Sequence, residues 1–335
     1  TIYRNNVTLT PSTLLIADGT IINADGPCFD VKANHVSILT QTPAGAVCKP
    51  GSPGVVVADG VDQFELVGLE IDGTGLTEGH GVEFEGDVTN VWLVNNYIHN
   101  MPGDGVHFTS GLGGIHNFIQ GNLFKDNTGA GVFNDGTVAI DARYNSWGHI
   151  DGAVAGDGID GDVDWSEHTH VDLYLGSSGT HYENQVVKDD EITYTVYGNL
   201  ANIHGVEFTL VLPEEVEYVE DSFENLAFNF AYFDDLGSGK LHLAGDQLLE
   251  DALPTPIGGE EIALFEIVLS GVEFGKELEI TYEATSGSFA HKGLDWGPTN
   301  YVYLIDYVEI GDLEVIDLPV LSQDGLDDDL FVGVE

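Results

Sequence analysis

An internal repeat dominates the first half of the chain, from about Asp59 to Gly148. Its segments superpose on two sets of anchor residues. The first set is a series of glycines spaced 27, 24 and 26 residues apart, each followed by valine: Gly54, Gly81, Gly105 and Gly131. The second set keeps step at 27, 26 and 23 residues: Ile71, Ile98, Phe124 and Trp147. A period of this length is typical of a solenoid, in which each repeat packs only on its neighbours.

Each repeat contains two or three short apolar runs separated by Gly, Asn and Asp, which leaves no room for a helix. In the runs 82–84 and 106–108, Val and Phe are expected to point inward, and the central Glu83 or His107 outward. A repeat built only of short strands predicts one turn of a parallel β-helix. Leu69 occupies a position that is asparagine in the later repeats. These asparagines, which predict a ladder of stacked side-chain amides along the solenoid axis, are Asn96, Asn122 and Asn145.

With this repeat, the chain resembles the right-handed parallel β-helix proteins of the pectate-lyase-like superfamily. The segment 144–152 (YNSWGHIDG) resembles the last turn and cap of many such proteins, where a similar Y-N-x-W-G is common. The resemblance covers about Thr1 to Thr169. It implies a right-handed parallel β-helix and is not specific for an activity.

Beyond Val171 the repeat stops and the apolar runs lengthen. Alternation in the runs 206–212 and 278–282 predicts half-buried antiparallel strands of a β-sandwich. The segments 192–219 and 258–271, with the start G-x-E-F-x-L, resemble the cohesin-like family. Members of that family are nine-strand jelly-roll sandwiches that hold dockerin modules in cellulosomes. The resemblance covers about residues 170 to 312 and does not extend to dockerin binding, because no recognition face can be placed.

The predicted fold class is therefore all-β: a right-handed parallel β-helix plus an antiparallel jelly-roll β-sandwich. We expect residues 1–168 to form the parallel β-helix and residues 169–316 the cohesin-like β-sandwich. Residues 317–335 are expected to form an acidic C-terminal tail with a short strand.

Charge excludes several classes of partner. The 335 residues include 57 acidic and 9 basic residues, for a net charge of −48. Nucleic acid and anionic membrane surfaces both require basic patches, so neither is an expected partner. No run of 18 apolar residues is present, and no membrane insertion is expected. High salt, divalent cations or low pH should offset the self-repulsion of such a chain.

Cys28 and Cys48 are the only cysteines and stand about one repeat apart. This spacing predicts a disulfide in an exported protein, with two buried thiols as the alternative. The chain starts at Thr1 and contains a single methionine, Met101, which is consistent with removal of a signal peptide. The expected location is extracellular or at the cell surface.

A string of aspartates near the expected domain boundary is the candidate metal site. It consists of Asp157, Asp160, Asp162 and Asp164. Alternating carboxylates can face one hard cation, so calcium is the predicted cofactor. The EF-hand pattern fails, because Trp165 and Val171 occupy the positions that require Gly and Glu. A solvated acidic turn is the alternative.

The candidate catalytic residues are His80, Glu83, Asp104 and His107. The repeat aligns His80 with Asp104 and Glu83 with His107, one turn apart on the outer surface, so an imidazole and a carboxylate could form an acid–base pair. The alternative, which we favour, is a solvated cross-strand pair. A lyase acting on uronates would need a base and several cations, and the repeat after Lys49 offers only two basic residues, Lys125 and Arg143.

We predict a non-catalytic extracellular or cell-surface structural or adhesive protein. Self-association through strand exchange would use Val7 to Thr10 and Leu330 to Val334, and would lead to filaments or a surface layer. One alternative is a polysaccharide-active enzyme or carbohydrate-binding module on the β-helix, where Trp92 could stack on a sugar. Another is a cohesin-type scaffold that docks a partner. Expected partners are thus further copies of the chain, a carbohydrate or a surface protein.

Overall fold

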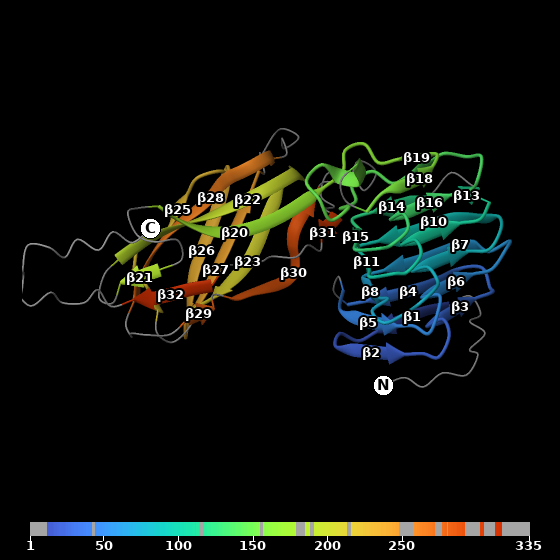
Figure 1. Ribbon diagram of the computed structural model, residues 1–335, viewed down its shortest axis with the longest axis horizontal. Coiled ribbons are helices and arrows are strands. Elements are labelled where there is room, and N and C mark those ends of the chain that lie inside the picture. The colour runs from blue at the N-terminus through green and yellow to red at the C-terminus, as the bar shows by residue number, and fades with distance from the viewer. Residues whose placement is uncertain are drawn as a thin grey trace, which may run out of the picture.

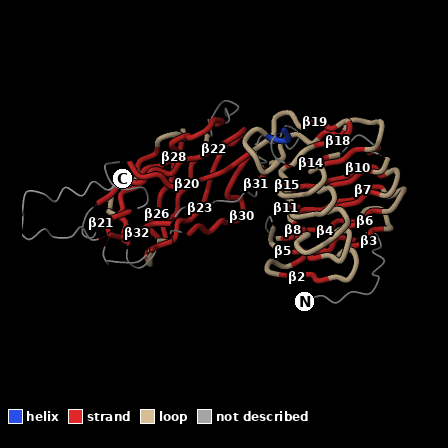
Figure 2. The backbone as a smooth tube through the Cα atoms, viewed as in Figure 1, coloured by secondary structure: helices blue, strands red, loops and turns tan. Residues whose placement is uncertain are grey.

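Two bodies of β-structure lie side by side, a stack of short strands and a pair of longer-stranded sheets (Figure 1). The computed structural model describes residues 12–41, 44–110, 112–113, 117–154, 157–178, 185–187, 191–212, 216–247, 257–271, 277–279, 281–291, 302–304 and 312–316. Strands and loops account for nearly all of these residues, and the one helix among them is the short 3₁₀ turn η1 (Gly152–Val154) (Figure 2). No helix in this part of the chain is long and apolar enough to cross a membrane.

The N-terminal body is a solenoid of three parallel sheets, and each turn of the chain contributes one strand to each sheet. The first sheet consists of β1 (Ser12–Ile16), β4 (Val36–Thr40), β7 (Asp62–Val67), β10 (Val88–Val94), β13 (Leu112–Gly113) and β14 (Phe118–Gln120). The second consists of β2 (Thr20–Asn23), β5 (Ala46–Lys49), β8 (Leu69–Asp72), β11 (Tyr97–His99) and β15 (Leu123–Lys125). The third consists of β3 (Phe29–Val31), β6 (Val55–Val57), β9 (Val82–Phe84), β12 (Val106–Phe108), β16 (Val132–Asn134) and β18 (Ile159–Gly161). A short parallel pair, β17 (Ile140–Asp141) and β19 (Val163–Asp164), lies at the end of the stack.

The two anchor series of the repeat have one physical cause. A Cβ atom on Gly81 would lie 2.4 Å from the side chain of Ile98 and 2.5 Å from the carbonyl oxygen of Gly105. At the other three anchor glycines a Cβ atom would lie 2.7 to 3.0 Å from the second anchor. At Gly54 and Gly105 it would also lie 2.3 and 2.6 Å from the carbonyl oxygen of the next anchor glycine. The second anchors themselves are fully buried in the solenoid core. Glycine is therefore required where the chain passes over a large apolar side chain, and the two series keep step because they touch.

The predicted asparagine ladder is present and buried. Nδ2 of Asn96 donates to Oδ1 of Asn122 at 2.9 Å, and Nδ2 of Asn122 donates to Oδ1 of Asn145 at 3.0 Å. Each Oδ1 also accepts a backbone N–H from the preceding turn of the solenoid. At the start of the ladder, this donor is the N–H of Leu69, which donates to Oδ1 of Asn96. The residue that precedes each ladder position has a positive φ: Gly68, Asn95, Gly121 and Tyr144. The ladder therefore satisfies backbone donors at a tight corner that strand pairing leaves open.

The predicted disulfide is also present. Cys28 and Cys48 are bonded, with Cα atoms 6.1 Å apart, and both side chains are buried. Cys48 lies on β5, and Cys28 directly precedes β3. The bond thus ties the first described turns of the solenoid together.

The C-terminal body contains two antiparallel sheets. One sheet consists of β20 (His170–Ser178), β22 (Glu191–Ile203), β24 (Val216–Tyr218), β25 (Glu224–Asn225) and β28 (Ile257–Gly271). The other has the order β26 (Phe230–Gly237), β27 (Lys240–Asp246), β23 (Gly205–Val211), β30 (Thr281–His291) and β31 (Val302–Leu304). A third, mixed sheet contains β21 (Gln185–Val187), β29 (Glu277–Glu279) and β32 (Asp312–Ile316).

Alternation along β23 predicts its core face correctly. Val206, Phe208 and Leu210 are buried in an apolar cluster with residues from β22, β27 and β28. Thr209, expected on the outer face, is buried as well, because β23 is a central strand and the hydroxyl of Thr209 meets the imidazole of His242 on β27. The strand is thus covered on both faces at this point.

The fold class is confirmed: the protein is all-β, with a parallel β-solenoid followed by antiparallel sheets. The domain boundaries 1–168, 169–316 and 317–335 stay predictions. Val7 to Thr10, Leu330 to Val334 and the tail 317–335 lie outside the described residues. Strand 278–282 is described in part, without its side chains.

Candidate functional site

A cluster of one aspartate and two histidines lies on the outer side of the third solenoid sheet. His80 precedes β9, Asp104 precedes β12, and His107 lies at the centre of β12, directly opposite Glu83 on β9. Oδ2 of Asp104 is 3.0 Å from Nδ1 of His80 and 2.7 Å from Nδ1 of His107. The structure thus brings together three of the four candidate residues. Glu83 is the cross-strand neighbour of His107 but not part of this contact set.

Close packing holds the three side chains. A Cβ atom at Gly103 would lie 2.8 Å from Nδ1 of His80, and one at Gly129 would lie 2.3 Å from Oδ1 of Asp104. The ring of His107 stacks on Phe133 with centroids 4.6 Å apart and an interplanar angle of 9°. Glycine at two turns and an aromatic ring on the next strand therefore shape the space around the cluster.

Asp104 is held as a carboxylate. Burial raises the pKa of this group. The contacts with His80 and His107 and the hydrogen bond that the Ala130 N–H donates to Oδ1 have the larger, opposite effect, and the pKa is lowered to about 2. Asp104 therefore cannot serve as a general acid near neutral pH. Its chemistry is to orient imidazoles or to bind a cation.

The four aspartates of the predicted calcium site lie in different settings. Asp157 is buried, whereas Asp160, Asp162 and Asp164 are exposed. The carboxylate of Asp164 accepts hydrogen bonds from the N–H and hydroxyl of Ser166. Within the described residues, they do not form a set of three ligand atoms within 4.8 Å of one another, as the His80 cluster does. Calcium at these positions stays a prediction.

Asp157 ends a second, shorter ladder. Its carboxylate accepts hydrogen bonds from the backbone N–H and from Nδ2 of Asn127, and Oδ1 of Asn127 in turn accepts the N–H of Met101. Burial raises the pKa of Asp157 to about 6. An ionised Asp157 therefore costs stability, although its position in the ladder is well bonded.

Replacing Asp157 with asparagine should change how stability depends on pH. An aspartate with a pKa of about 6 in the folded state and about 3.9 in the unfolded state destabilises the fold as pH rises from about 4 to 6, because the unfolded chain releases its proton first. At pH 7 Asp157→Asn should therefore be more stable than the parent by about 2 kcal/mol, with no gain at pH 4. Chemical denaturation of both proteins at the two pH values measures this difference. An equal difference at both pH values would contradict the assignment.

A second candidate site is a hollow on the first solenoid sheet. The indole of Trp92 is 37% exposed and meets Phe118 edge to face, with ring centroids 5.7 Å apart. Polar side chains of neighbouring turns surround it. The residues that line the hollow are His35, Ser37, Gln63, Phe64, Glu65, Asn90 and Trp92. An exposed aromatic face beside hydrogen-bonding groups is an arrangement that can hold a sugar.

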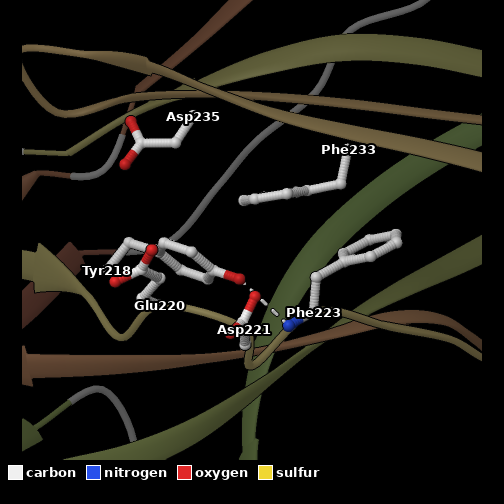
Figure 3. A pocket seen from close by; sticks show the side chains of 6 residues that line it. All are labelled: Tyr218, Glu220, Asp221, Phe223, Phe233 and Asp235. Carbon is white, nitrogen blue, oxygen red and sulfur yellow. Dashed lines mark hydrogen bonds between the residues drawn. The ribbon is translucent and has the colours of Figure 1, made fainter.

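A third candidate site is a groove in the C-terminal body, near the edge strands β24 and β26. Its lining combines aromatic rings and carboxylates, namely Tyr218, Glu220, Asp221, Phe223, Phe233 and Asp235 (Figure 3). The ring of Phe233 stacks on Phe223 and also contacts Tyr218, each at a centroid distance of 4.8 Å. The hydroxyl of Tyr218 accepts the backbone N–H groups of Ser222 and Phe223, which closes the loop that carries the acidic residues.

Sequence reasoning did not find this groove. The available signal was the alternation in strand β26, where Phe230 and Tyr232 are separated by Ala231 and followed by Phe233. In the structure Phe233 packs against the core cluster and lines the groove, whereas Phe230 and Tyr232, on the other face of the strand, are 68% and 51% exposed and lie outside the groove lining. An alternating run with aromatic residues on both faces indicates a strand whose outer face is also used.

Comparisons with known proteins do not assign the chain to a family. No family model matches the sequence, and no curated protein matches it. Solved structures similar to the chain include the sixth cohesin of scaffoldin B from Acetivibrio cellulolyticus, solved in complex with a dockerin (12% identity, TM-score 0.31). They also include a non-cellulosomal cohesin from the archaeon Archaeoglobus fulgidus (14% identity, TM-score 0.30). The matches cover 45% and 44% of this chain and 100% and 91% of those chains. At these TM-scores the likeness identifies neither a family nor a function.

Proposed function

We propose that the chain is a non-catalytic structural or adhesive component of an extracellular or cell-surface assembly. In this proposal the solenoid is a stiff spacer, and the C-terminal sheets supply the contact surface. The disulfide between Cys28 and Cys48 supports an exported location, because such bonds persist in oxidising compartments. The lowered pKa of Asp104 argues against a general-acid role for this residue.

The observation that carries the proposal is the exposed apolar face of β26. Phe230, Tyr232 and Leu236 are all more than half exposed on one strand. Within the described residues, β26 pairs on one side only, with β27, so it forms an edge of its sheet. Proteins rarely leave an apolar edge strand uncovered, since such an edge accepts a strand from another chain. A surface of this kind on a chain with a net charge of −48 indicates a contact that works against charge repulsion.

We propose that strand addition at β26 is the contact, with 7–10 or 330–334 of another copy as the added strand. Both segments lie outside the described residues, so this pairing rests on their sequence and on the free edge. A contact from the end of one chain to the side of another does not close on itself, which leads to filaments or layers. Salt or divalent cations should promote it by screening the acidic surface.

Replacing Phe230 and Tyr232 together with serine should abolish assembly. In high salt the parent chain is expected to sediment as large species, and the double variant as a monomer with an unchanged melting temperature. Trp92→Ala is the matched control, because it also removes an exposed aromatic ring, but from the solenoid. Unchanged sedimentation of the double variant would reject β26 as the contact. A monomeric parent that binds a different protein through β26 would favour the cohesin-type scaffold.

A second function, carbohydrate binding, is favoured by one observation, the exposed indole of Trp92 amid polar side chains. In that case Trp92→Ala would lose affinity for a polysaccharide, such as pectin, alginate or a glucan, and the β26 double variant would keep it. Cleavage of such a polysaccharide that is lost in Asp104→Ala would instead support an enzyme.

A further inference from the structure

The cluster of His80, Asp104 and His107 offers three electron-pair donors at one point. The three ligand atoms lie within 4.8 Å of one another, and the two contacts to Asp104 Oδ2 are 3.0 and 2.7 Å. A zinc-like ion binds imidazole nitrogen and carboxylate oxygen at about 2.0–2.2 Å, which places adjacent ligand atoms about 3.0–3.5 Å apart. A small outward shift of the side chains is therefore enough to admit an ion.

Protons alone do not satisfy this cluster. The backbone N–H of Asp104 donates to Nδ1 of His80 at 2.9 Å, which requires a lone pair on that nitrogen. The same nitrogen lies 3.0 Å from Oδ2 of Asp104, a second contact that is favourable only with a proton between the two atoms. Either protonation state therefore leaves one of the two contacts unfavourable. A cation that displaces the N–H of Asp104 from the lone pair of His80 Nδ1 would be attracted by both imidazoles and by the carboxylate.

The side chains around the cluster are arranged as around a metal ligand. Oδ1 of Asp104 is anchored by the N–H of Ala130 at 2.8 Å, which directs Oδ2 toward the histidines. Stacking on Phe133 fixes the plane of the His107 ring. The side chains of His80 and His107 are 26% and 20% exposed, so the open side of the cluster faces solvent. Glu83, opposite His107 on β9, is the carboxylate placed to approach as a fourth ligand.

We propose that His80, Asp104 and His107 form a binding site for a divalent transition-metal ion of the zinc class. Two imidazoles and one carboxylate suit Zn²⁺, Co²⁺, Ni²⁺ or Cu²⁺, whereas Ca²⁺ and Mg²⁺ prefer shells of oxygen ligands. Three protein ligands with a solvent-facing side leave a coordination position for water or for a side chain of another molecule.

Calorimetric titration of the full chain with Zn²⁺, after treatment with chelator and in high salt with excess Mg²⁺, tests the site. The parent should bind one equivalent. His107→Gln and Asp104→Asn should each bind it at least about 100-fold more weakly, since loss of even an outer supporting partner costs about 10–100-fold. The matched control is His99→Gln, which removes a histidine whose ion pair among the described residues is with the carboxylate of Glu70, at 3.1 Å. This control should keep the parent affinity.

Co²⁺ provides a second readout, because its visible absorption reports ligand geometry and does not depend on stability. The parent and His99→Gln should give the same bands, and His107→Gln should give none; melting curves show whether each variant is folded. Equal zinc affinity in His107→Gln and the parent would mean that the acidic surface holds the ion, and would overturn the proposal. Absence of binding to the parent would also overturn it. Stabilisation by Ca²⁺ that survives in His107→Gln belongs to the predicted aspartate site, not to this cluster.

Discussion

Replacing Asn122 with alanine should lower the free energy of unfolding by about 4 kcal/mol. Oδ1 of Asn122 accepts the backbone N–H and Nδ2 of Asn96, while Nδ2 donates to the carbonyl of Leu93 and to Oδ1 of Asn145. These groups are buried. Without the amide, the N–H of Asn96 and the carbonyl of Leu93 lose their side-chain partner, whereas Nδ2 of Asn96 keeps the carbonyl of Leu66 and Oδ1 of Asn145 keeps the N–H of residue 122. Each orphaned buried group costs about 1–3 kcal/mol. Denaturation by guanidinium, whose ionic strength also screens the acidic surface, measures the loss.

The control for this experiment is Asn100→Ala. Asn100 follows β11, at the opposite end of the strand from the ladder residue Asn96; it is exposed, and its amide bonds to the ring of His99. Its φ is 54°, a left-handed conformation in which alanine is strained, so Asn100→Ala should cost about 1–2 kcal/mol, still less than the loss at Asn122. If the two variants lost equal stability, the ladder would contribute nothing beyond an ordinary surface asparagine, and the ladder's structural role would have to be abandoned.

Removing the disulfide should cost about 3 kcal/mol. The bonded residues are 20 apart, and closing a loop of this length restricts the unfolded chain by about that amount. The double variant Cys28→Ala and Cys48→Ala is preferable to serine, because both sites are buried in the apolar core of the first turns. The loss of amide protection against hydrogen exchange should be greatest in β2, β3 and β5, which the bond ties together.

Two comparisons make the disulfide result decisive. The parent in reductant should approach the stability of the double variant, and reductant should leave the double variant unchanged. Peptide mapping without reduction should show the linked pair. A parent whose thiols are demonstrably reduced yet whose melting is unaltered would show that the bond is not a source of stability in this fold.

The repeat of the solenoid could be predicted from the sequence. Gly81 and Ile98 belong to series that recur together, because the side chain of Ile98 fills the space that a Cβ atom at position 81 would need. The same contact is repeated between the later pairs of anchor residues. Burial on strands follows the same logic: Val82 and Phe84 are buried, and Glu83 is not. Such features are local and periodic, so neighbouring repeats supply the evidence for each other. The asparagine ladder was predictable for the same reason. The disulfide was predicted from the distance between the two cysteines, which is about one repeat.

The way in which the side chains of the histidine–aspartate cluster meet could not be fully predicted from the sequence. Repeat alignment pairs His80 with Asp104, and these side chains do meet, at 3.0 Å. It also pairs Glu83 with His107, which are cross-strand neighbours, but the imidazole of His107 turns to Asp104 of its own turn. Stacking on Phe133 orients His107, and the space left by Gly103 and Gly129 admits His80 and Asp104; these are contacts between turns that no residue pattern encodes.

The aspartate string and the edge strand β26 show the same difference between what the sequence predicts and what the tertiary structure decides. The sequence placed Asp157 with Asp160, Asp162 and Asp164 by spacing, whereas tertiary structure places it beneath Asn127 as the end of a ladder. The exposure of Phe230 and Tyr232 likewise depends on which strand ends the sheet, which is a matter of strand order. Sequence alone determined the period and the buried face of this protein, because both repeat, and it favoured the disulfide over two free thiols. Tertiary structure decided which polar and aromatic side chains meet, because those contacts join segments whose register and rotamers are set only when the sheets assemble.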